Sequence, residues 1–80
     1  MEIKIRTYAA LKDHFSDSFS MNLPQNSTIG EMKKKLALDK PQSSDLLEKC
    51  RFAINQEFAA CDARISSGDI IDILPPSSGG

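Results

Sequence analysis

Segments in which apolar and polar residues alternate one by one lie at both ends of this chain. Ile3 and Ile5 alternate with charged neighbours near the start, and the same period of two recurs over residues 18–23 and 70–74. Successive side chains of a strand point to opposite faces, so this alternation predicts strands with one buried face. The chain has 80 residues, enough for one small domain, and such strands favour a single sheet.

The longest predicted helix follows the second of these strands. Thr28 and Glu31 have the spacing of a capping box, in which each side chain accepts a hydrogen bond from the other residue's backbone N–H. Apolar residues then recur at helical spacing to about Leu38, and Pro41 forbids a simple continuation. The sequence therefore predicts one amphipathic helix in the middle of the chain.

The remaining segments predict shorter elements. Residues 8–15 predict a short helix with one apolar edge, and residues 43–50 predict one or two further helical turns. Strands are expected over residues 51–55 and 57–59, with a tight turn between them, and a second turn is expected over residues 66–69 before the last strand.

This order of elements predicts an α+β fold, in which a mixed sheet packs on one main helix plus a short helix. Residues 1–74 are the expected domain. The expected core contains the apolar residues that share the buried faces: Ile3, Ile5, Met21, Leu23, Ile29, Met32, Leu36, Phe52, Ile54, Ile71 and Ile73.

Composition excludes several classes of function. The 10 basic and 11 acidic residues leave a net charge of −1, so non-specific binding to nucleic acid has no electrostatic driving force. The run of lysines at residues 33–35 is therefore expected to be a solvated helix face. No apolar run approaches the ~18 residues of a membrane span, and the alternating start of the chain is unlike a signal peptide. We expect a cytoplasmic protein with neither nucleic acid nor a membrane as its partner.

Residues suited to conventional catalysis are scarce. The single histidine, His14, has no cysteine or histidine at metal-ligand spacing, so no metal site is expected. Cys50 and Cys61 are expected to be inert, partly buried thiols. If this chain takes part in chemistry, it does so through a partner or through its own backbone.

The last six residues, Pro75-Pro76-Ser77-Ser78-Gly79-Gly80, are not explained by the core. Paired prolines end ladder pairing and stiffen the chain, so residues 75–80 are expected to form a flexible tail of about 20 Å. On its own, such a tail is typical of a frayed terminus or a linker. A terminal carboxylate, however, is able to attack the α-phosphate of ATP, and glycines pass a narrow channel that larger residues would block.

Four segments together resemble the ubiquitin-like β-grasp sulfur carriers, and within them the small subunits of molybdopterin synthase. Residues 8–12 are similar to the aromatic-alanine segment of that family, residues 54–58 to its Asn-Gln hairpin, and residues 67–71 to its Gly-Asp turn. Residues 75–80 are similar to its Pro-Pro…Gly-Gly terminus, except that Ser77 stands where the family usually has a β-branched apolar residue.

The resemblance implies a β-grasp (ubiquitin-like) fold and a chemistry for the tail. A ubiquitin-activating-like adenylyltransferase, using ATP and magnesium, would adenylate Gly80, which Gly79 precedes. Gly80 would then become a thiocarboxylate and donate sulfur to cyclic pyranopterin phosphate, which makes the dithiolene of molybdopterin. The chain would be a non-catalytic sulfur-donor subunit of a sulfurtransferase complex and would itself bind no cofactor.

The resemblance also implies partners. The large subunit of molybdopterin synthase would bind the small one in a heterotetramer of two small and two large subunits. Its implied contacts are Tyr8, Phe58 and Leu74, together with the tail residues Pro75, Pro76, Ser77 and Ser78. Arg6 and Lys12 are further candidates, for pairing with acidic groups of a partner.

Three alternatives stay open at the level of sequence. The chain would serve another pathway as a sulfur carrier, such as thiamine synthesis or tRNA thiolation, or it would be a ubiquitin-like modifier joined to lysines. The third alternative is a β-grasp interaction module with an inert tail.

Overall fold

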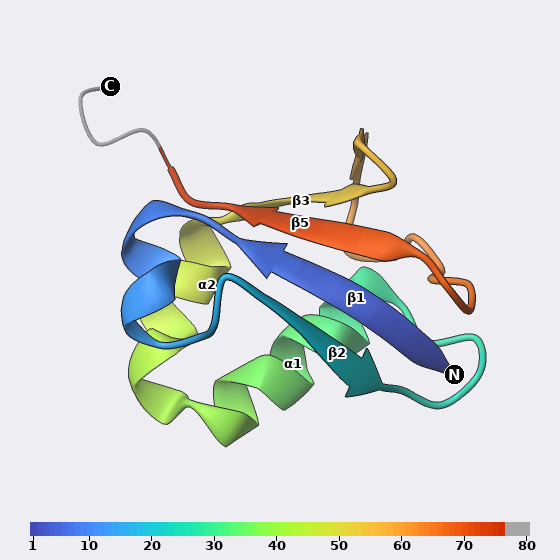
Figure 1. Ribbon diagram of the computed structural model, residues 1–80, viewed down its shortest axis with the longest axis horizontal. Coiled ribbons are helices and arrows are strands. Elements are labelled where there is room, and N and C mark those ends of the chain that lie inside the picture. Colours follow the sequence, from blue (N-terminus) through green and yellow to red (C-terminus); the bar gives the residue numbers. More distant parts are fainter. Residues whose placement is uncertain (77–80) are drawn as a thin grey trace.

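One mixed sheet with helices on one side forms the body of the protein, as the computed structural model shows for residues 1–76 (Figure 1). The elements in chain order are β1 (Glu2–Thr7), η1 (Ala9–Asp13), β2 (Ser18–Asn22), α1 (Ile29–Asp39), η2 (Pro41–Ser43), α2 (Ser44–Lys49), β3 (Arg51–Ile54), β4 (Glu57–Ala59) and β5 (Ile70–Leu74). Every predicted strand is present to within one residue at each end.

The strands lie in the order β2-β1-β5-β3-β4. β5, the last strand in the chain, pairs with β1 in parallel, and the other neighbouring strands are antiparallel. The parallel pair brings the ends of β1 and β5 to the same edge of the sheet, so the chain leaves β5 beside the start of η1 (Figure 1). The predicted mixed sheet is therefore confirmed, and its central strand leads into the C-terminal segment.

The helix-side face of the sheet is apolar. Ile5 lies opposite Ile71 and Thr7 lies opposite Ile73 across the parallel pair, and Phe52 continues the same layer on β3. All of these side chains are buried, and α1 covers them with Ile29, Met32 and Leu36. Burying large apolar side chains is the main favourable contribution to folding a domain of this size.

The start of α1 is fixed by the predicted capping box. The Glu31 backbone N–H donates to Thr28 Oγ1 at 3.2 Å, and the Thr28 backbone N–H donates to Glu31 Oε1 at 2.9 Å. The next two N–H groups donate to the loop before β5, Ile29 to the Ala63 carbonyl at 3.0 Å and Gly30 to the Cys61 carbonyl at 2.8 Å. These bonds satisfy donors that a helix start leaves unpaired and join α1 to the irregular segment.

Two predictions about the core were wrong in detail. Ile54 is only partly buried, because it is the last residue of β3 and adjoins the turn that leads to β4. Conversely, Leu11, Leu47 and Ile65 are almost completely buried, although none of them is in the expected core. Leu11 and Ile65 lie in a short 3₁₀ turn and in an irregular segment, which carry no long periodic pattern.

The segment after β1 also differs from the predicted helix over residues 8–15. It is a 3₁₀ helix limited to Ala9–Asp13, and Ala9 has a positive φ of 52°. The 3₁₀ form is the usual one for connections as short as this. Phe15, the far end of the predicted apolar edge, stacks on Phe19 with ring centroids 5.9 Å apart.

The predicted turn between β3 and β4 is confirmed. Asn55 and Gln56 have φ values of 49° and 72°, the left-handed pair that two-residue hairpin turns require. Asn55 also accepts from the Ile70 N–H at 3.0 Å through Oδ1 and donates to Asp69 Oδ1 at 3.0 Å through Nδ2. The hairpin is thereby attached to the start of β5.

Candidate functional site

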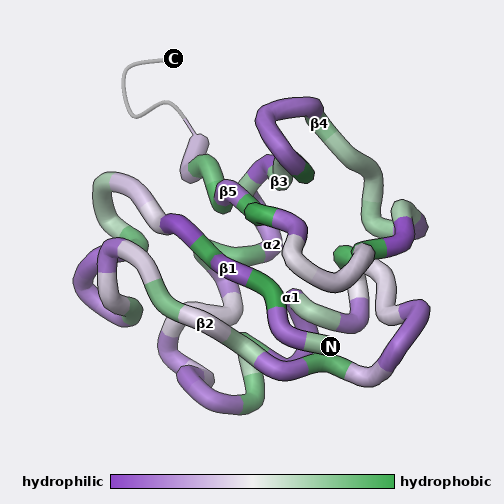
Figure 2. The backbone as a smooth tube through the Cα atoms, turned by 45° about the vertical axis from the view of Figure 1, so that its right-hand side comes forward, coloured by the Kyte–Doolittle hydropathy of each residue, from purple (hydrophilic) through white to green (hydrophobic). Residues whose placement is uncertain are grey.

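The second face of the sheet is free of helices among residues 1–76, and hydrophilic and hydrophobic positions alternate along its central strands (Figure 2). Strand register places five residues of β3, β4 and β5 on it, because Arg51 lies opposite Leu74 and Ala53 lies opposite both Phe58 and Asp72. We call this the open face and define it by Arg6, Tyr8, Arg51, Phe58, Asp72 and Leu74.

The three predicted apolar contacts all lie on the open face. Phe58 is 63% exposed and Tyr8 is 38% exposed, which is unusual for side chains of this size, and Leu74 is partly buried. Tyr8 follows β1 with extended backbone and so keeps the orientation of the alternate β1 residues. The structure therefore brings Tyr8 and Leu74 to the end of the sheet from which the C-terminal segment departs.

An ion pair lies at the centre of the open face. Arg6 Nε donates to Asp72 Oδ1 at 2.7 Å and Arg6 Nη2 donates to Asp72 Oδ2 at 2.9 Å, which is the bidentate fork of a strong arginine–carboxylate pair. The Tyr8 hydroxyl donates to Asp72 Oδ1 at 3.0 Å. The side chain of Asp72 is only 9% exposed, so these bonds compensate a carboxylate that is nearly withdrawn from water.

These contacts shift the pKa of each partner. The hydrogen bonds from Arg6 are the main cause that lowers the pKa of Asp72, and burial opposes them. The hydrogen bond to Asp72 is the main cause that raises the pKa of the Tyr8 phenol, since ionisation would break that bond beside a carboxylate. The same pair raises the pKa of Arg6. At neutral pH the network consists of a carboxylate, a guanidinium and a neutral phenol.

Arg6, predicted to pair with acidic groups of a partner, pairs with Asp72 of its own chain through Nε and Nη2, a contact that the sequence analysis did not foresee. Lys12, the other predicted partner contact, lies 3.8 Å from Asp17 in an exposed pair. Asp72 was missed by the sequence analysis. Its signal was an acidic residue between Ile71 and Ile73, at a position of the last strand that faces away from the core.

Phe58 is held by a neighbouring cation. The guanidinium carbon of Arg51 lies 4.0 Å from the centre of the Phe58 ring, a cation–π arrangement across the two strands. Both residues are exposed, so the arrangement presents a flat aromatic and guanidinium surface to solvent. Such a surface is suited to protein contacts, in which aromatic and arginine side chains are enriched.

The C-terminal segment begins at the end of the open face. Pro75 is partly buried and Pro76 is exposed, and neither belongs to a strand, as the paired prolines predicted. Four of the predicted site residues, Ser77, Ser78, Gly79 and Gly80, lie outside the described residues.

The cysteines and lysines differ in part from their predictions. Cys50 is partly buried as expected, and burial raises the pKa of its thiol, but Cys61 is exposed. Cys61 Sγ lies 3.9 Å from Lys33 Nζ.

Lys34 and Lys35 are exposed, whereas the side chain of Lys33 is only 16% exposed and pairs with Glu48 at 3.4 Å. Within residues 1–76, no three histidine, cysteine or acidic side chains gather as a metal site would require.

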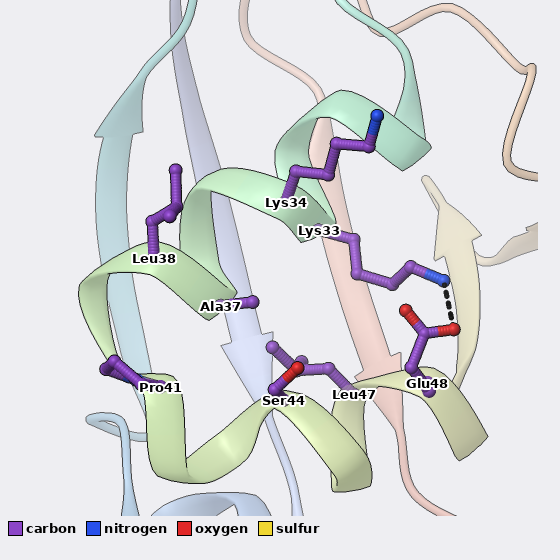
Figure 3. A pocket seen from close by; sticks show the side chains of 8 residues that line it. All are labelled: Lys33, Lys34, Ala37, Leu38, Pro41, Ser44, Leu47 and Glu48. Atoms are coloured by element: carbon purple, nitrogen blue, oxygen red, sulfur yellow. Dashed lines mark hydrogen bonds and ion pairs between the residues drawn. The ribbon is translucent and has the colours of Figure 1, made fainter.

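A hollow of about 490 Å³ lies on the other side of the molecule, between α1 and the segment that contains η2 and α2 (Figure 3). Leu38, at 80% exposure, and Ala37 line it from α1, and Pro41 and Leu47 line it from the other side. The Lys33–Glu48 pair closes one end. This hollow lies away from the C-terminal segment and holds none of the predicted site residues.

Comparison with known proteins identifies relatives among sulfur carriers. Residues 5–80 match the ThiS family. The chain is 39% identical over 83 residues to the molybdopterin synthase sulfur carrier subunit of Dictyostelium discoideum, an alignment that covers 99% of this chain and 96% of that protein.

Solved structures show the same fold at low identity. The crystal structure of SAMP1 from Haloferax volcanii has a TM-score of 0.85 at 21% identity, with 100% of both chains covered. A complex of subunits 1 and 2 of molybdopterin-converting factor from Helicobacter pylori has a TM-score of 0.72 at 22% identity, again with 100% of both chains covered.

The fold is thus a ubiquitin-like β-grasp, as the family resemblance implied. The chain belongs to the ThiS family of sulfur carriers and is a homologue of the small subunits of molybdopterin synthase. Within residues 1–76 no helix has both the length and the apolar character needed to cross a membrane.

Proposed function

We propose that this chain is the sulfur-carrier small subunit of molybdopterin synthase. The observation that carries the proposal is the 39% identity to a named carrier subunit over 99% of the chain. The match to the ThiS family extends to residue 80, which includes the Gly79-Gly80 pair. The fold supports the proposal because its central strand leads into the segment that ends in these glycines.

The proposed chemistry takes place at the carboxylate of Gly80. A carboxylate oxygen attacks the α-phosphate of ATP, pyrophosphate leaves, and an acyl-adenylate forms in the active site of an adenylyltransferase that resembles ubiquitin-activating enzymes. A sulfur nucleophile then displaces AMP and leaves a thiocarboxylate. ATP and magnesium are bound by the activating enzyme, and this chain needs no acid, base or metal of its own.

The sulfur acceptor is cyclic pyranopterin phosphate, held by the large subunit. That subunit supplies the catalytic groups, and residues 75–80 carry the thiocarboxylate to them. Successive transfers from carrier chains provide the two sulfurs of the dithiolene. In this scheme the chain is a sulfur-donor subunit rather than a catalytic one.

The open face is the proposed docking surface for the large subunit. Tyr8, Phe58 and Leu74 are the apolar contacts that a partner would cover, and exposed apolar groups gathered on one surface mark interfaces. Pro75, Pro76, Ser77 and Ser78 would lead the tail from this surface into the partner. The complex from Helicobacter pylori supports a pairing of this kind, and two small with two large subunits would form the assembly.

Intact-mass measurement tests the proposal directly. The chain with its native C-terminus is incubated with the activating enzyme, ATP, magnesium and a sulfur donor, and its mass is expected to rise by one exchange of oxygen for sulfur. A variant that lacks Gly79 and Gly80 is the matched control and is expected to stay unchanged while unfolding at the same urea concentration. Equal loading of both chains would contradict the proposal.

A protein-modifier function is the second candidate. It is favoured by one observation, a solved neighbour from H. volcanii that is named a small archaeal modifier protein. A modifier would appear in a lysate as a ladder of conjugates that disappears when Gly79 and Gly80 are deleted. A carrier for another pathway, such as thiamine synthesis or tRNA thiolation, would acquire sulfur but would not bind the large subunit.

A further inference from the structure

The open face has a charged centre with apolar surroundings. Arg6 and Asp72 form their bidentate pair in the middle of the sheet, on strands β1 and β5. Tyr8 is bonded to the pair, and Leu74 and Phe58 lie on the same face of β5 and β4. A partner that covers the apolar residues therefore covers the ion pair as well.

Arg6 keeps unused hydrogen-bonding capacity on this surface. A guanidinium carries five N–H donors, and Asp72 accepts one from Nε and one from Nη2. Within residues 1–76, no group accepts a hydrogen bond from Nη1 of Arg6. The Arg6 side chain is 35% exposed, so water is able to reach it in the free protein.

Docking would remove the water that reaches Arg6, because the partner covers the open face. A charged donor that is buried without an acceptor weakens binding, whereas a matched acceptor restores the lost hydrogen bonds. Lys4, Arg6 and Arg51 on this face stand against two acids, Glu2 and Asp72, so its own charge is positive. A carboxylate is the acceptor that both the geometry and the charge favour.

We propose that Arg6 is a specificity-determining residue, and that the partner seated on the open face places a carboxylate against its outward N–H groups. Asp72 fixes the guanidinium in one orientation, so the free edge of Arg6 always faces the partner. This inference rests on the proposed function, since the partner is the molybdopterin synthase large subunit. A protein with an apolar patch but no acid at this point would bind more weakly, because it would bury the Arg6 guanidinium without an acceptor.

The test replaces the ion pair by leucines. The double variant Arg6→Leu/Asp72→Leu leaves an apolar face with no group to satisfy, and its affinity for the purified large subunit of the same organism is measured by calorimetry at low and at high salt. We expect binding at least tenfold weaker than wild type, with a smaller dependence on salt. Lys34→Leu, which removes an exposed cation of α1 on the helix side of the sheet, is the matched control and is expected to bind like wild type.

Equal or tighter binding by the double variant would overturn the inference, because it would show that the partner offers only apolar surface. If the double variant does not fold, Arg6→Lys and Arg6→Gln decide the question. Lysine keeps the charge and should bind within a few-fold of wild type, whereas neutral glutamine should bind at least tenfold more weakly; equal affinities of the two would contradict the proposal. If the wild-type chain fails to bind the large subunit at all, the proposed function falls together with this inference.

Discussion

The two faces of the sheet show how one set of strands serves two purposes. On the helix-side face, Ile3, Ile5, Ile71 and Ile73 are at most 1% exposed and contact α1 and its neighbours. On the open face, Arg6 and Asp72 of the same two strands form a bidentate ion pair, and Phe58 of the edge strand β4 is 63% exposed. Since alternate residues point to opposite faces, changes on one face should be separable from the other. Stability is expected to depend on the first face and partner binding on the second.

The largest effect is expected from a pair of neighbouring isoleucines. Ile71 is fully buried, whereas Ile70 is only partly buried and points to the opposite face. Ile71→Ala should lower the free energy of unfolding by about 2–5 kcal/mol, because it removes buried methyl groups and leaves a cavity. Ile70→Ala should lower it much less. Urea unfolding of both variants checks this, and equal losses would contradict the separation of the two faces.

Affinity for the large subunit should depend on exposed residues of the open face rather than on buried ones. Phe58→Asp places a charge at the exposed ring and removes the cation–π contact with Arg51, so affinity for the large subunit should fall by more than about tenfold. The free energy of unfolding should change by less than about 1 kcal/mol, since Phe58 is on an edge strand and exposed.

Leu38→Asp is the matched control for this binding experiment. Leu38 is 80% exposed on the helical side of the molecule, so the same chemical change there should leave affinity unaltered. Loss of binding in Leu38→Asp, or unfolding of Phe58→Asp, would show that the docking surface has been assigned to the wrong face.

The ion pair should give the open face a pH signature. Because hydrogen bonds from Arg6 hold the pKa of Asp72 below its ordinary value of 3.8, the carboxylate stabilises the fold above the unfolded pKa. That contribution is lost as pH falls through the lower, folded pKa. The free-energy difference between wild type and Asp72→Asn should therefore be constant near neutral pH and shrink below about pH 4. Urea unfolding across this range measures it, and a difference that does not change with pH would contradict the pairing.

The smallest effect concerns the Tyr8 phenol, which belongs to the only tyrosine of the chain. Its pKa lies above the ordinary value of 10.0, mainly because the hydroxyl donates to Asp72. In Asp72→Asn the charged acceptor is gone, so the phenol should ionise at a lower pH than in wild type. Ultraviolet titration detects the phenolate without interference from tryptophan, which the chain lacks. An unchanged titration would mean that the network is not formed in solution.

Local patterns predicted most of the fold. The capping box of Thr28 and Glu31 and the left-handed turn at Asn55 depend on residues close in sequence, and both formed as expected. Leu11 and Ile65 were missed because they are buried by segments without a long periodic pattern, so only the tertiary structure shows it.

The candidate site was predictable only in its apolar part. Tyr8, Phe58 and Leu74 were assigned through the family resemblance, and the structure places all three on the open face. The partner of Arg6 was not found, because Asp72 lies 66 residues away and pairs with it only when β5 lies parallel to β1. Long-range strand pairing of this kind leaves no local trace in the sequence, apart from one acid among isoleucines.

The most direct test of the account blocks the terminal carboxyl group chemically. The chain is prepared with Gly80 as a C-terminal amide, mixed with the activating enzyme, the sulfur donor, the large subunit and cyclic pyranopterin phosphate, and the dithiolene product is measured beside the same reaction with the free acid. The account predicts product from the free acid alone, since only a carboxylate is able to attack ATP and accept sulfur. Dithiolene formed at an equal rate by the amide would contradict it.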